Sequence, residues 1–336
     1  MASRSSQSAQ PTTPVHQNGC MRIALALGSG GARGYAHIGV INELQERGYE
    51  IVGVAGSSMG ALVGGLHAAG KLDEFSHWAS SLTQRAVLRL LDPSLNSPGV
   101  LRAEKILDAV RDILGDVTIE ALPIPYTSVA TDLISGKAVW LQRGPLDDAI
   151  RASIAIPGIF TPHLLDGRLL ADGGILDPLP MAPIAAVNAD LTIAVSLSGD
   201  DPAPGINTPQ PRVTTEFLGR MWRSTTALLD TATAQRMMDS PAAKSVLGRF
   251  SSALDEAPEE PAEGVPALPR LGSFEIMNRT IDIAQAALAR HTLATYPPDL
   301  LIEVPRTACR SLEYHRAEEV IEIGQELAAA ALDAMD

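Results

Sequence analysis

The chain has 336 residues, 46% of them hydrophobic, which is enough for one large domain or two ordinary ones with a substantial core. Its 26 basic and 39 acidic residues give a net charge of -13, which argues against nucleic-acid binding and against a general attraction to anionic lipid. The two cysteines, Cys20 and Cys309, cannot build a disulfide framework or a cysteine-based metal site, and a cytoplasmic setting is expected.

Residues 1–20 are rich in serine, glutamine, proline and threonine, and they lack the apolar stretch of a signal peptide. They predict a disordered N-terminal extension. The sequence contains no run of about 18 consecutive apolar residues, so we expect no membrane-spanning helix. A peripheral contact with a membrane would have to be local and apolar.

Strands and helices are expected to alternate in residues 21–200, which we interpret as the folded core. Apolar runs predict strands at 22–27 and 51–55, followed by helices at 35–47 and 59–69. This alternation predicts a three-layer α/β/α fold with a mostly parallel central sheet. Further helices are expected at 72–90, 102–114 and 146–154, and further strands at 126–131, 137–142 and 191–196.

Residues 201–336 are expected to form a C-terminal, mainly helical part that packs on the core. Apolar periodicity predicts helices at 213–239, 273–291 and 317–331, with a late strand at 300–304. Between the first two helices, residues 251–269 combine acidic residues with prolines and predict a mobile surface loop.

The segment G-S-S-M-G, Gly56 to Gly60, predicts a tight turn between a strand and a helix, with Ser58 at the turn. Gly56 and Gly60 leave room for the bend, and the amides at the start of the helix face any charge that develops near the hydroxyl. This is the nucleophile-elbow pattern of acyl hydrolases. The same pattern also fits an ordinary strand-to-helix turn, so it needs support from elsewhere in the chain.

A glycine-rich turn, G-S-G-G-A-R-G from Gly28 to Gly34, separates the first strand from the first helix. Such a turn aims several backbone N–H groups at one point, which suits a phosphate or a developing oxyanion. A dinucleotide fingerprint would need glycine where Arg33 stands, and a P-loop would need a following Gly-Lys-Ser/Thr. With the elbow nearby, an oxyanion hole is favoured over a nucleotide site or an ordinary turn.

The segment A-D-G-G, residues 171–174, places Asp172 at the end of an expected strand, where its carboxylate could act as a base. Taken alone, an Asp-Gly turn is the simpler interpretation. Asp132 is a second candidate carboxylate, ranked lower because a Thr-Asp pair at a hairpin is commonly a turn cap.

A Ser-His-Asp triad is the rival arrangement, because His291 and His315 follow Asp172 in the chain order of α/β-hydrolases. Neither histidine lies in a short loop after an obvious final strand, and His291 continues a helical face. His37 is expected to pack or hydrogen-bond near the glycine loop. The spacing of the histidines provides no metal-binding pair of the H-x-x-x-H or H-E-x-x-H type, so no metal site is predicted.

Taken in order, three blocks resemble the signature blocks of patatin-like phospholipases: Gly28 to Gly34, Gly56 to Gly60, and Asp172-Gly173-Gly174. The segments S-I-A-I-P-G-I-F-T-P, Ser153 to Pro162, and Ala130 to Asp132 are similar to segments of the bacterial members. The resemblance covers residues 21–199. One departure is Ser29, which stands where the family usually has the first glycine of its glycine-rich motif.

The resemblance implies a lipid acyl hydrolase, of phospholipase A or lysophospholipase type, that cleaves carboxylic esters of phospholipids or lysophospholipids without a metal or cofactor. Ser58 would be the nucleophile and Asp172 the general base of a dyad that works through an acyl-serine intermediate. The glycine loop would form the oxyanion hole. Residues expected to bind the oxyanion or substrate are Gly30, Gly31, Ala32, Arg33, Gly34 and Met59.

Three points stay open at this stage. Arg33 could orient the glycine loop, meet a phosphate head group, or pair with a structural carboxylate. Met59 most simply packs under the elbow. The alternatives to the dyad enzyme are a non-catalytic lipid-binding or scaffold protein of the same fold, and a Ser-His-Asp esterase that uses His291 or His315.

Overall fold

The computed structural model describes residues 20–90, 104–157, 159–199 and 273–335. The expected N-terminal extension, except Cys20, the helix at 213–239 and the loop at 251–269 lie outside the described residues. Within the described ranges, no helix is both long and apolar enough to cross a membrane.

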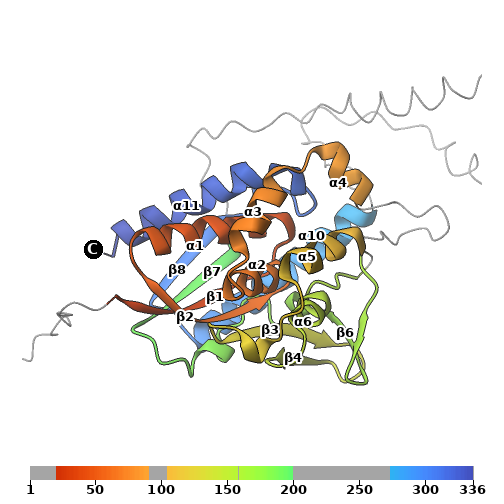
Figure 1. Cartoon of the computed structure of the whole chain (residues 1–336), viewed down its shortest axis with the longest axis horizontal. Helices are drawn as coiled ribbons and strands as arrows, with labels where there is room; N and C mark the ends of the chain where they lie inside the picture. Colours follow the sequence, from red (N-terminus) through yellow and green to blue (C-terminus); the bar gives the residue numbers. More distant parts are fainter. Residues whose placement is uncertain (1–19, 91–103, 158, 200–272, 336) are drawn as a thin grey trace, which may run out of the picture. The chain divides into compact units, whose positions relative to one another are not determined.

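An eight-stranded sheet forms the centre of the described fold, in the order β5-β6-β3-β2-β1-β7-β8, with β4 paired to β3 outside this path (Figure 1). The strands are β1 (Arg22–Leu27), β2 (Glu50–Ser57), β3 (Tyr126–Asp132), β4 (Lys137–Leu141), β5 (His163–Leu165), β6 (Arg168–Asp172), β7 (Leu191–Gly199) and β8 (Leu300–Pro305). The pairs β1–β2, β1–β7, β2–β3 and β7–β8 are parallel, whereas β4 and β6 run antiparallel to β3 and β5 runs antiparallel to β6. The mostly parallel sheet predicted from the alternation of elements is confirmed.

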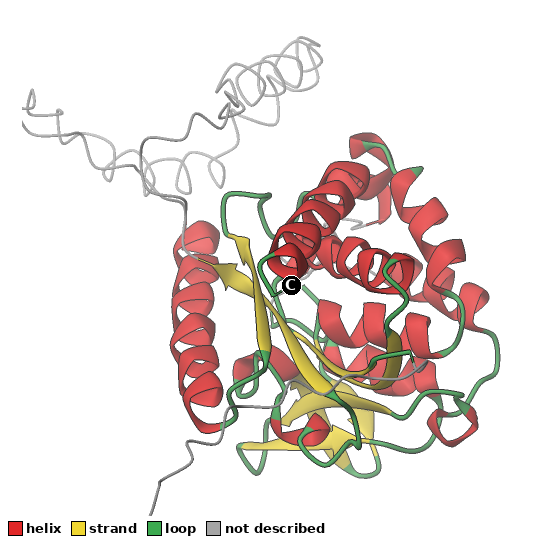
Figure 2. Ribbon diagram, turned by 90° about the vertical axis from the view of Figure 1, so that its left-hand side faces the viewer, coloured by secondary structure: helices red, strands yellow, loops and turns green. Residues whose placement is uncertain are grey.

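Helices cover both faces of this sheet, as Figure 2 shows. The α-helices are α1 (Ala36–Glu46), α2 (Met59–Ala68), α3 (Leu72–Ser80), α4 (Gln84–Leu90), α5 (Glu104–Leu114), α6 (Leu146–Ser153), α10 (Ser273–Thr295) and α11 (Ala317–Asp333). Short 3-10 helices are η1 (Gly31–Tyr35), η2 (Ile119–Ala121), η3 (Gly173–Ile175), η4 (Ala182–Ile184) and η5 (Tyr314–Arg316). The three-layer α/β/α arrangement is therefore also confirmed.

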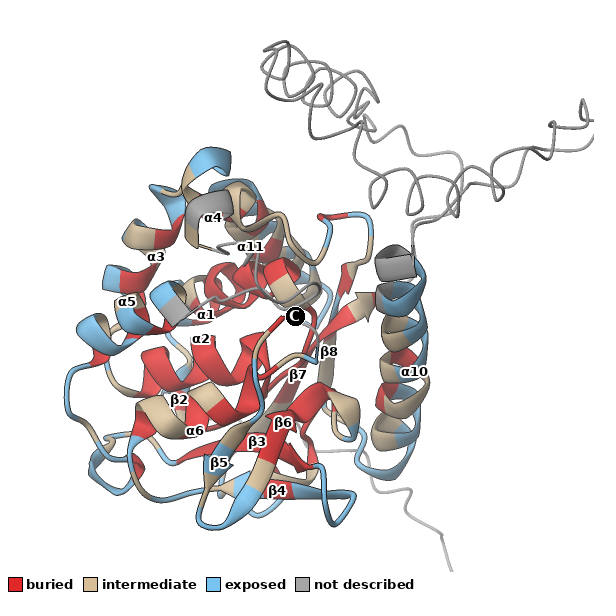
Figure 3. Cartoon of the chain, turned by 90° about the vertical axis from the view of Figure 1, so that its right-hand side faces the viewer, coloured by how far each residue is buried: buried red, intermediate tan, exposed pale blue. Residues whose placement is uncertain are grey.

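The first strand shows how the sequence divides the core between the two faces. Side chains alternate across a strand, so Ile23, Leu25 and Leu27 face one side, and Ala24 and Ala26 face the other. The branched residues join the large cluster with α1, α2 and α11, whereas the alanines join a smaller cluster with η4 and α10. Small side chains on this face pack against residues of α10 and η4, and Figure 3 shows α10 beside β7 and β8.

Helix α11 lies along α1 in contact with it (Figure 1). Glycines make this close approach feasible: a Cβ on Gly39 would lie 1.9 Å from Ile321 O, and one on Gly324 would lie 2.1 Å from Ala36 O. Because η5 comes directly before α11, this packing holds the segment that contains Tyr314 near the start of α1.

One expected helix is divided in two. The sequence predicts a continuous helix over residues 72–90, and the structure has α3 and α4 with a break at 81–83. The Thr83 side chain accepts a hydrogen bond from the amide of Ala86 at 3.2 Å, which is the geometry of an N-terminal cap. The threonine thus starts a new helix instead of continuing the first.

Candidate active site

Ser58 occupies a strained turn between β2 and α2. Its backbone angles are φ 54° and ψ -120°, in a region that residues with a side chain rarely adopt. A Cβ on Gly56 would lie 2.2 Å from Gly60 O, and a Cβ on Gly60 would lie 2.1 Å from Leu27 O. Both glycines of the elbow are therefore required by the close approach of backbone to backbone.

Strand register brings Ser58 and Asp172 together across β3. Ser57, the last residue of β2, pairs with Val129, and the neighbouring Ala130 pairs with Asp172 at the end of β6. The Ser58 hydroxyl donates a hydrogen bond to Asp172 Oδ2 at 2.5 Å. The amide of Gly174 donates to the other carboxylate oxygen, Oδ1, at 2.8 Å. The carboxylate thus has one oxygen fixed by backbone and the other directed at the serine.

Burial influences the protonation state of the Asp172 carboxyl. Only 3% of Asp172 and 4% of Ser58 is exposed. Loss of solvent raises the pKa of Asp172 from 3.8 to about 6, although the hydrogen bonds from Ser58 and Gly174 oppose the rise. A carboxylate whose pKa lies closer to neutrality is a stronger base than an ordinary exposed aspartate, and it is still mainly ionised at pH 7.

Ser153, at the end of α6, holds the elbow in place through hydrogen bonds. The amide of Ser58 donates to Ser153 Oγ at 2.9 Å, and Ser153 Oγ donates to Val129 O at 2.5 Å. The amide of Asp172 donates to Ala155 O at 3.0 Å. The turn after α6 therefore fixes the backbone of both members of the pair. Sequence reasoning did not single out Ser153 as a site residue, although it opens the S-I-A-I-P-G segment.

The glycine loop between β1 and α1 is held by hydrogen bonds along its length. The amides of Gly28 and Ser29 donate to Val195 O and Pro178 O at 3.0 and 2.8 Å. His37 Nε2, buried and with its pKa lowered to about 4 by desolvation, donates to Gly28 O at 2.8 Å. The expected position of His37 beside the loop is confirmed.

The amide of Ala32 and the side chain of Arg33 have structural partners. The amide of Ala32 donates to Ser311 O at 2.9 Å, so it is taken up in anchoring the loop. Arg33 is 4% exposed, its Nε donates to Gly30 O at 3.2 Å, and its Nη2 lies 2.9 Å from Asp282 Oδ1. Of the roles considered for Arg33, the structure supports loop orientation together with pairing to a structural carboxylate. Gly34 lies inside η1, where a Cβ would meet Met59 Cγ at 2.2 Å.

Gly31 and Met59 retain amides that can face a ligand. Each is the first residue of its helix, η1 and α2 respectively, and a helix provides no acceptor of its own for its first N–H groups. Both residues line the same pocket as Ser58. Gly30, just before η1, has its carbonyl held by Arg33, and a Cβ there would lie 2.6 Å from Leu197 Cβ.

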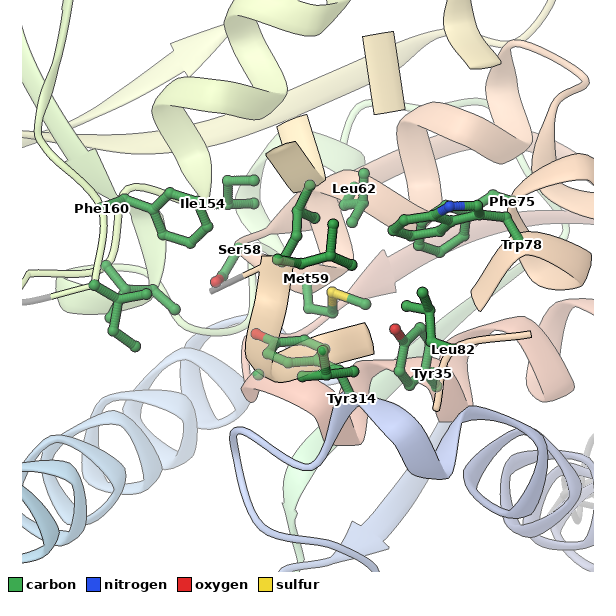
Figure 4. Close-up of a pocket in the computed structure, with 16 residues that line it drawn as sticks. Tyr35, Ser58, Met59, Leu62, Phe75, Trp78, Leu82, Ile154, Phe160 and Tyr314 are labelled. Atoms are coloured by element: carbon green, nitrogen blue, oxygen red, sulfur yellow. The ribbon is translucent and has the colours of Figure 1, made fainter. Parts of the chain in front are cut away.

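The pocket beside Ser58 is almost wholly apolar (Figure 4). The empty space within it, including open solvent at its mouth, is about 650 Å³. In Figure 4, Leu62 lies between Ser58 and the aromatic pair Phe75 and Trp78. The lining residues are Gly31, Tyr35, Ser58, Met59, Leu62, Phe75, Trp78, Leu82, Val87, Leu90, Ile106, Ile154, Ile156, Ile159, Phe160 and Tyr314. Helices α3, α4 and α5 thus contribute side chains to this pocket.

Tyr314 is a further polar group of the pocket that sequence reasoning missed. It comes from η5, far along the chain, and its ring packs edge-on against Tyr35 with centroids 6.1 Å apart. Burial and the nearby Asp172 charge raise the pKa of Tyr314, which keeps the phenol protonated. No pattern around residue 314 indicates this role, because only the packing of α11 brings it here.

The remaining candidates lie apart from the pair. Asp132 accepts hydrogen bonds from the amides of Ile134 and Ser135, so it caps the β3–β4 turn as ranked from sequence. His291 is exposed on α10 and His315 is half-buried in η5. Within the described ranges, the hydrogen-bond partners of Ser58 and Asp172 include neither imidazole, and no cluster of three metal-ligating side chains occurs.

Comparisons with known proteins show what this chain is similar to. Residues 25–185 match the family model described as patatin-like phospholipase. Over 333 residues the chain is 67% identical to the uncharacterized NTE family protein Rv1063c of Mycobacterium tuberculosis, covering 94% of this chain and 92% of that protein. It is 33% identical over 186 residues to neuropathy target esterase sws of Drosophila melanogaster, covering 53% of this chain and 13% of the fly protein.

One further relative and one solved structure are also similar to this chain. Lysophospholipase NTE1 of Mycosarcoma maydis is 34% identical over 200 residues, which are 55% of this chain and 10% of the fungal protein. Among solved structures, VipD from Legionella pneumophila has a TM-score of 0.43 and 14% sequence identity, covering 94% of this chain and 67% of that chain. By its family-model match and its near full-length relative, the chain belongs to the patatin-like phospholipase family, among the NTE family proteins.

Proposed function

We propose that this protein is a serine hydrolase that cleaves acyl esters of phospholipids or lysophospholipids, with Ser58 as nucleophile and Asp172 as general base. The observation that carries the proposal is the 2.5 Å hydrogen bond from Ser58 Oγ to a buried carboxylate beside an apolar pocket. A serine hydroxyl is a weak nucleophile at neutral pH until an adjacent base takes its proton. Asp172 is the group within reach of that proton.

In the first half of the reaction, Ser58 Oγ attacks the ester carbonyl carbon while its proton passes to Asp172 Oδ2. The carbonyl electron pair moves onto oxygen, and the amides of Gly31 and Met59 are the donors best placed to stabilise that charge. Collapse of the tetrahedral intermediate breaks the bond to the leaving alcohol, which takes the proton from Asp172. The product is an ester between the acyl group and Ser58.

In the second half, a water molecule attacks the acyl-serine carbonyl and gives a proton to Asp172. Collapse of the second tetrahedral intermediate breaks the bond to Ser58 Oγ, which recovers the proton. The same carboxylate thus acts as base and then as acid in each half, as microscopic reversibility requires. The carboxylic acid leaves, and the pair returns to its starting state.

The pocket supports an acyl chain as the group transferred. Burial of apolar surface contributes about 0.8 kcal/mol for each CH₂ removed from water, so a long chain would bind well among these side chains. Two relatives in the same family carry the names lysophospholipase and neuropathy target esterase, which supports an ester substrate of lipid type.

The alternatives make different demands on the site. A non-catalytic lipid-binding protein would need the apolar pocket and not the aligned hydroxyl and carboxylate. A Ser-His-Asp esterase would need an imidazole between Ser58 and Asp172, where the two side chains already touch. The direct contact therefore favours the dyad hydrolase.

Replacing either member of the pair is expected to remove ester hydrolysis. Ser58→Ala deletes the nucleophile and Asp172→Asn deletes the base, so each should lower kcat by about 10³-fold or more. Asp132→Asn is the matched control, because Asp132 is also buried at a strand end and caps a turn that asparagine can cap. Turnover of a p-nitrophenyl ester measures the activity of all three variants. Near-normal turnover in purified Ser58→Ala would contradict the proposal.

The pH profile should reveal the raised pKa of Asp172. Below its pKa the carboxyl is protonated and cannot take the Ser58 proton, so kcat/KM should fall with a midpoint of about 6 as the pH is lowered. An unperturbed aspartate would place this limb near 3.8.

Asp177 provides the control for this profile, because burial also raises its pKa to about 6. The limb should stay in place in Asp177→Asn. A midpoint near that of an ordinary aspartate, or a limb that disappears in Asp177→Asn, would count against Asp172 as the base.

Filling the pocket should select against long acyl chains. Leu62→Trp inserts a large side chain between Ser58 and Trp78, so kcat/KM for a dodecanoyl ester should fall about tenfold or more relative to an acetyl ester. Leu164→Trp, at a position 70% exposed, should leave the ratio unchanged. Equal ratios in the two variants would show that the acyl chain lies elsewhere.

A further inference from the structure

Helix α10 contributes two polar side chains to the glycine loop, although it lies outside the residues that match the family model. Asp282 Oδ1 lies 2.9 Å from Arg33 Nη2, and Ser29 Oγ donates to Gln285 Oε1 at 3.2 Å. Positions 282 and 285 are three residues apart, so both side chains leave the same face of the helix. Figure 3 shows α10 beyond β7 and β8, on the far side of the sheet from α1 and α2.

Arg33 connects this contact to the backbone of the loop. Its guanidinium is held by Asp282 at Nη2 while Nε donates to Gly30 O at 3.2 Å, and only 5% of the side chain is exposed. Because the guanidinium is planar and rigid, fixing one of its edges also fixes the direction of the other donors. Asp282 thereby limits where the Gly30 carbonyl can point.

The peptide bond between Gly30 and Gly31 couples the direction of the Gly30 carbonyl to that of the Gly31 N–H. In a trans peptide, the carbonyl of one residue and the N–H of the next point to opposite sides. Holding the Gly30 carbonyl on the Arg33 side therefore turns the Gly31 N–H away from Arg33. Gly31 lines the pocket with Ser58, so this amide is directed by a chain of contacts that begins at Asp282.

Gln285 reaches the other half of the site. A Cβ on Gly174 would lie 2.6 Å from Gln285 Nε2 and 2.6 Å from Ser29 Oγ, so these three residues pack against one another. The Gly174 amide is the donor that fixes Asp172 Oδ1. One turn of α10 therefore contacts both the glycine loop and the turn that holds the carboxylate.

We propose that Asp282 is a positioning residue for the oxyanion hole, acting through Arg33, with Gln285 holding Ser29 beside it. The inference rests on the proposed function, because the direction of the Gly31 amide matters when an oxyanion forms. An interaction made only in the transition state changes kcat and leaves KM near its original value. A purely structural ion pair would instead change the stability of the fold and leave both constants alone.

The test uses the full chain and separate measurement of kcat and KM with a short-chain p-nitrophenyl ester. Asp282→Asn should lower kcat about tenfold with little change in KM. This loss is smaller than that on removing an oxyanion donor outright, which is about 10²- to 10³-fold. Gln285→Leu is a second variant, expected to lower kcat by a few fold in the same way.

Asp147→Asn is the matched control. Asp147 also lies 2.9 Å from an arginine, Arg111, and its side chain is 24% exposed against 28% for Asp282. This variant loses an ion pair of the same length away from the glycine loop, so its kcat should stay at the wild-type value. An equal loss of kcat in both variants would overturn the inference.

A double-mutant cycle tests whether Asp282 acts through Arg33. Arg33→Gln alone should lower kcat, and adding Asp282→Asn to it should cost nothing further. If the two losses of kcat multiply in the double variant, Asp282 does not act through Arg33.

The failure of this inference is distinct from the failure of the proposed function. The positioning role alone is overturned if Ser58→Ala abolishes hydrolysis while Asp282→Asn and Gln285→Leu keep a normal kcat. Absence of Ser58-dependent hydrolysis in the wild type overturns both.

Discussion

The contact between Ser58 and Asp172 depends on a backbone conformation that costs free energy. A serine at φ 54° is strained by about 1–3 kcal/mol, and it persists because its surroundings leave no alternative. Gly56 and Gly60 allow the backbones to meet, and Ser153 accepts the hydrogen bond of the Ser58 amide. The surrounding core thus holds the hydroxyl against the carboxylate before any substrate is present, which is the preorganisation that catalysis of acyl transfer needs.

The same burial gives the site its electrostatic character. Asp172 sits among groups that exclude water, and the desolvation that raises its pKa also makes it a stronger proton acceptor. The apolar pocket next to it keeps the local dielectric low, so the Gly31 and Met59 amides that we propose as oxyanion donors would act more strongly than in water. In the mechanism that we propose, the acyl-binding surface and the basicity of the dyad have one physical origin.

Much of the fold and the central pair could be predicted from the sequence, because glycine patterns and apolar runs are local signals. Gly56, Gly60 and Asp172 lie in short segments whose geometry is set by their neighbours. Three contributions could not be predicted in this way: Ser153, Tyr314 and the α10 side chains. Arg33 and Asp282 are 249 positions apart, and only the packing of α10 on the sheet brings them together. The division of residues 72–90 into two helices depends on a single capping threonine, which the apolar periodicity does not reveal. The β5–β6 turn contains Asp166 and Gly167, both at positive φ.

The most direct measurement of the central claim is mass-spectrometric mapping of a fluorophosphonate adduct on the folded protein. Such a probe reacts with a serine whose hydroxyl is activated by a base. We expect an adduct on the peptide that contains Ser58 in the wild type, and its loss in Asp172→Asn. An adduct on another residue, or labelling of Ser58 that is undiminished in Asp172→Asn, would contradict a dyad in which Asp172 activates Ser58.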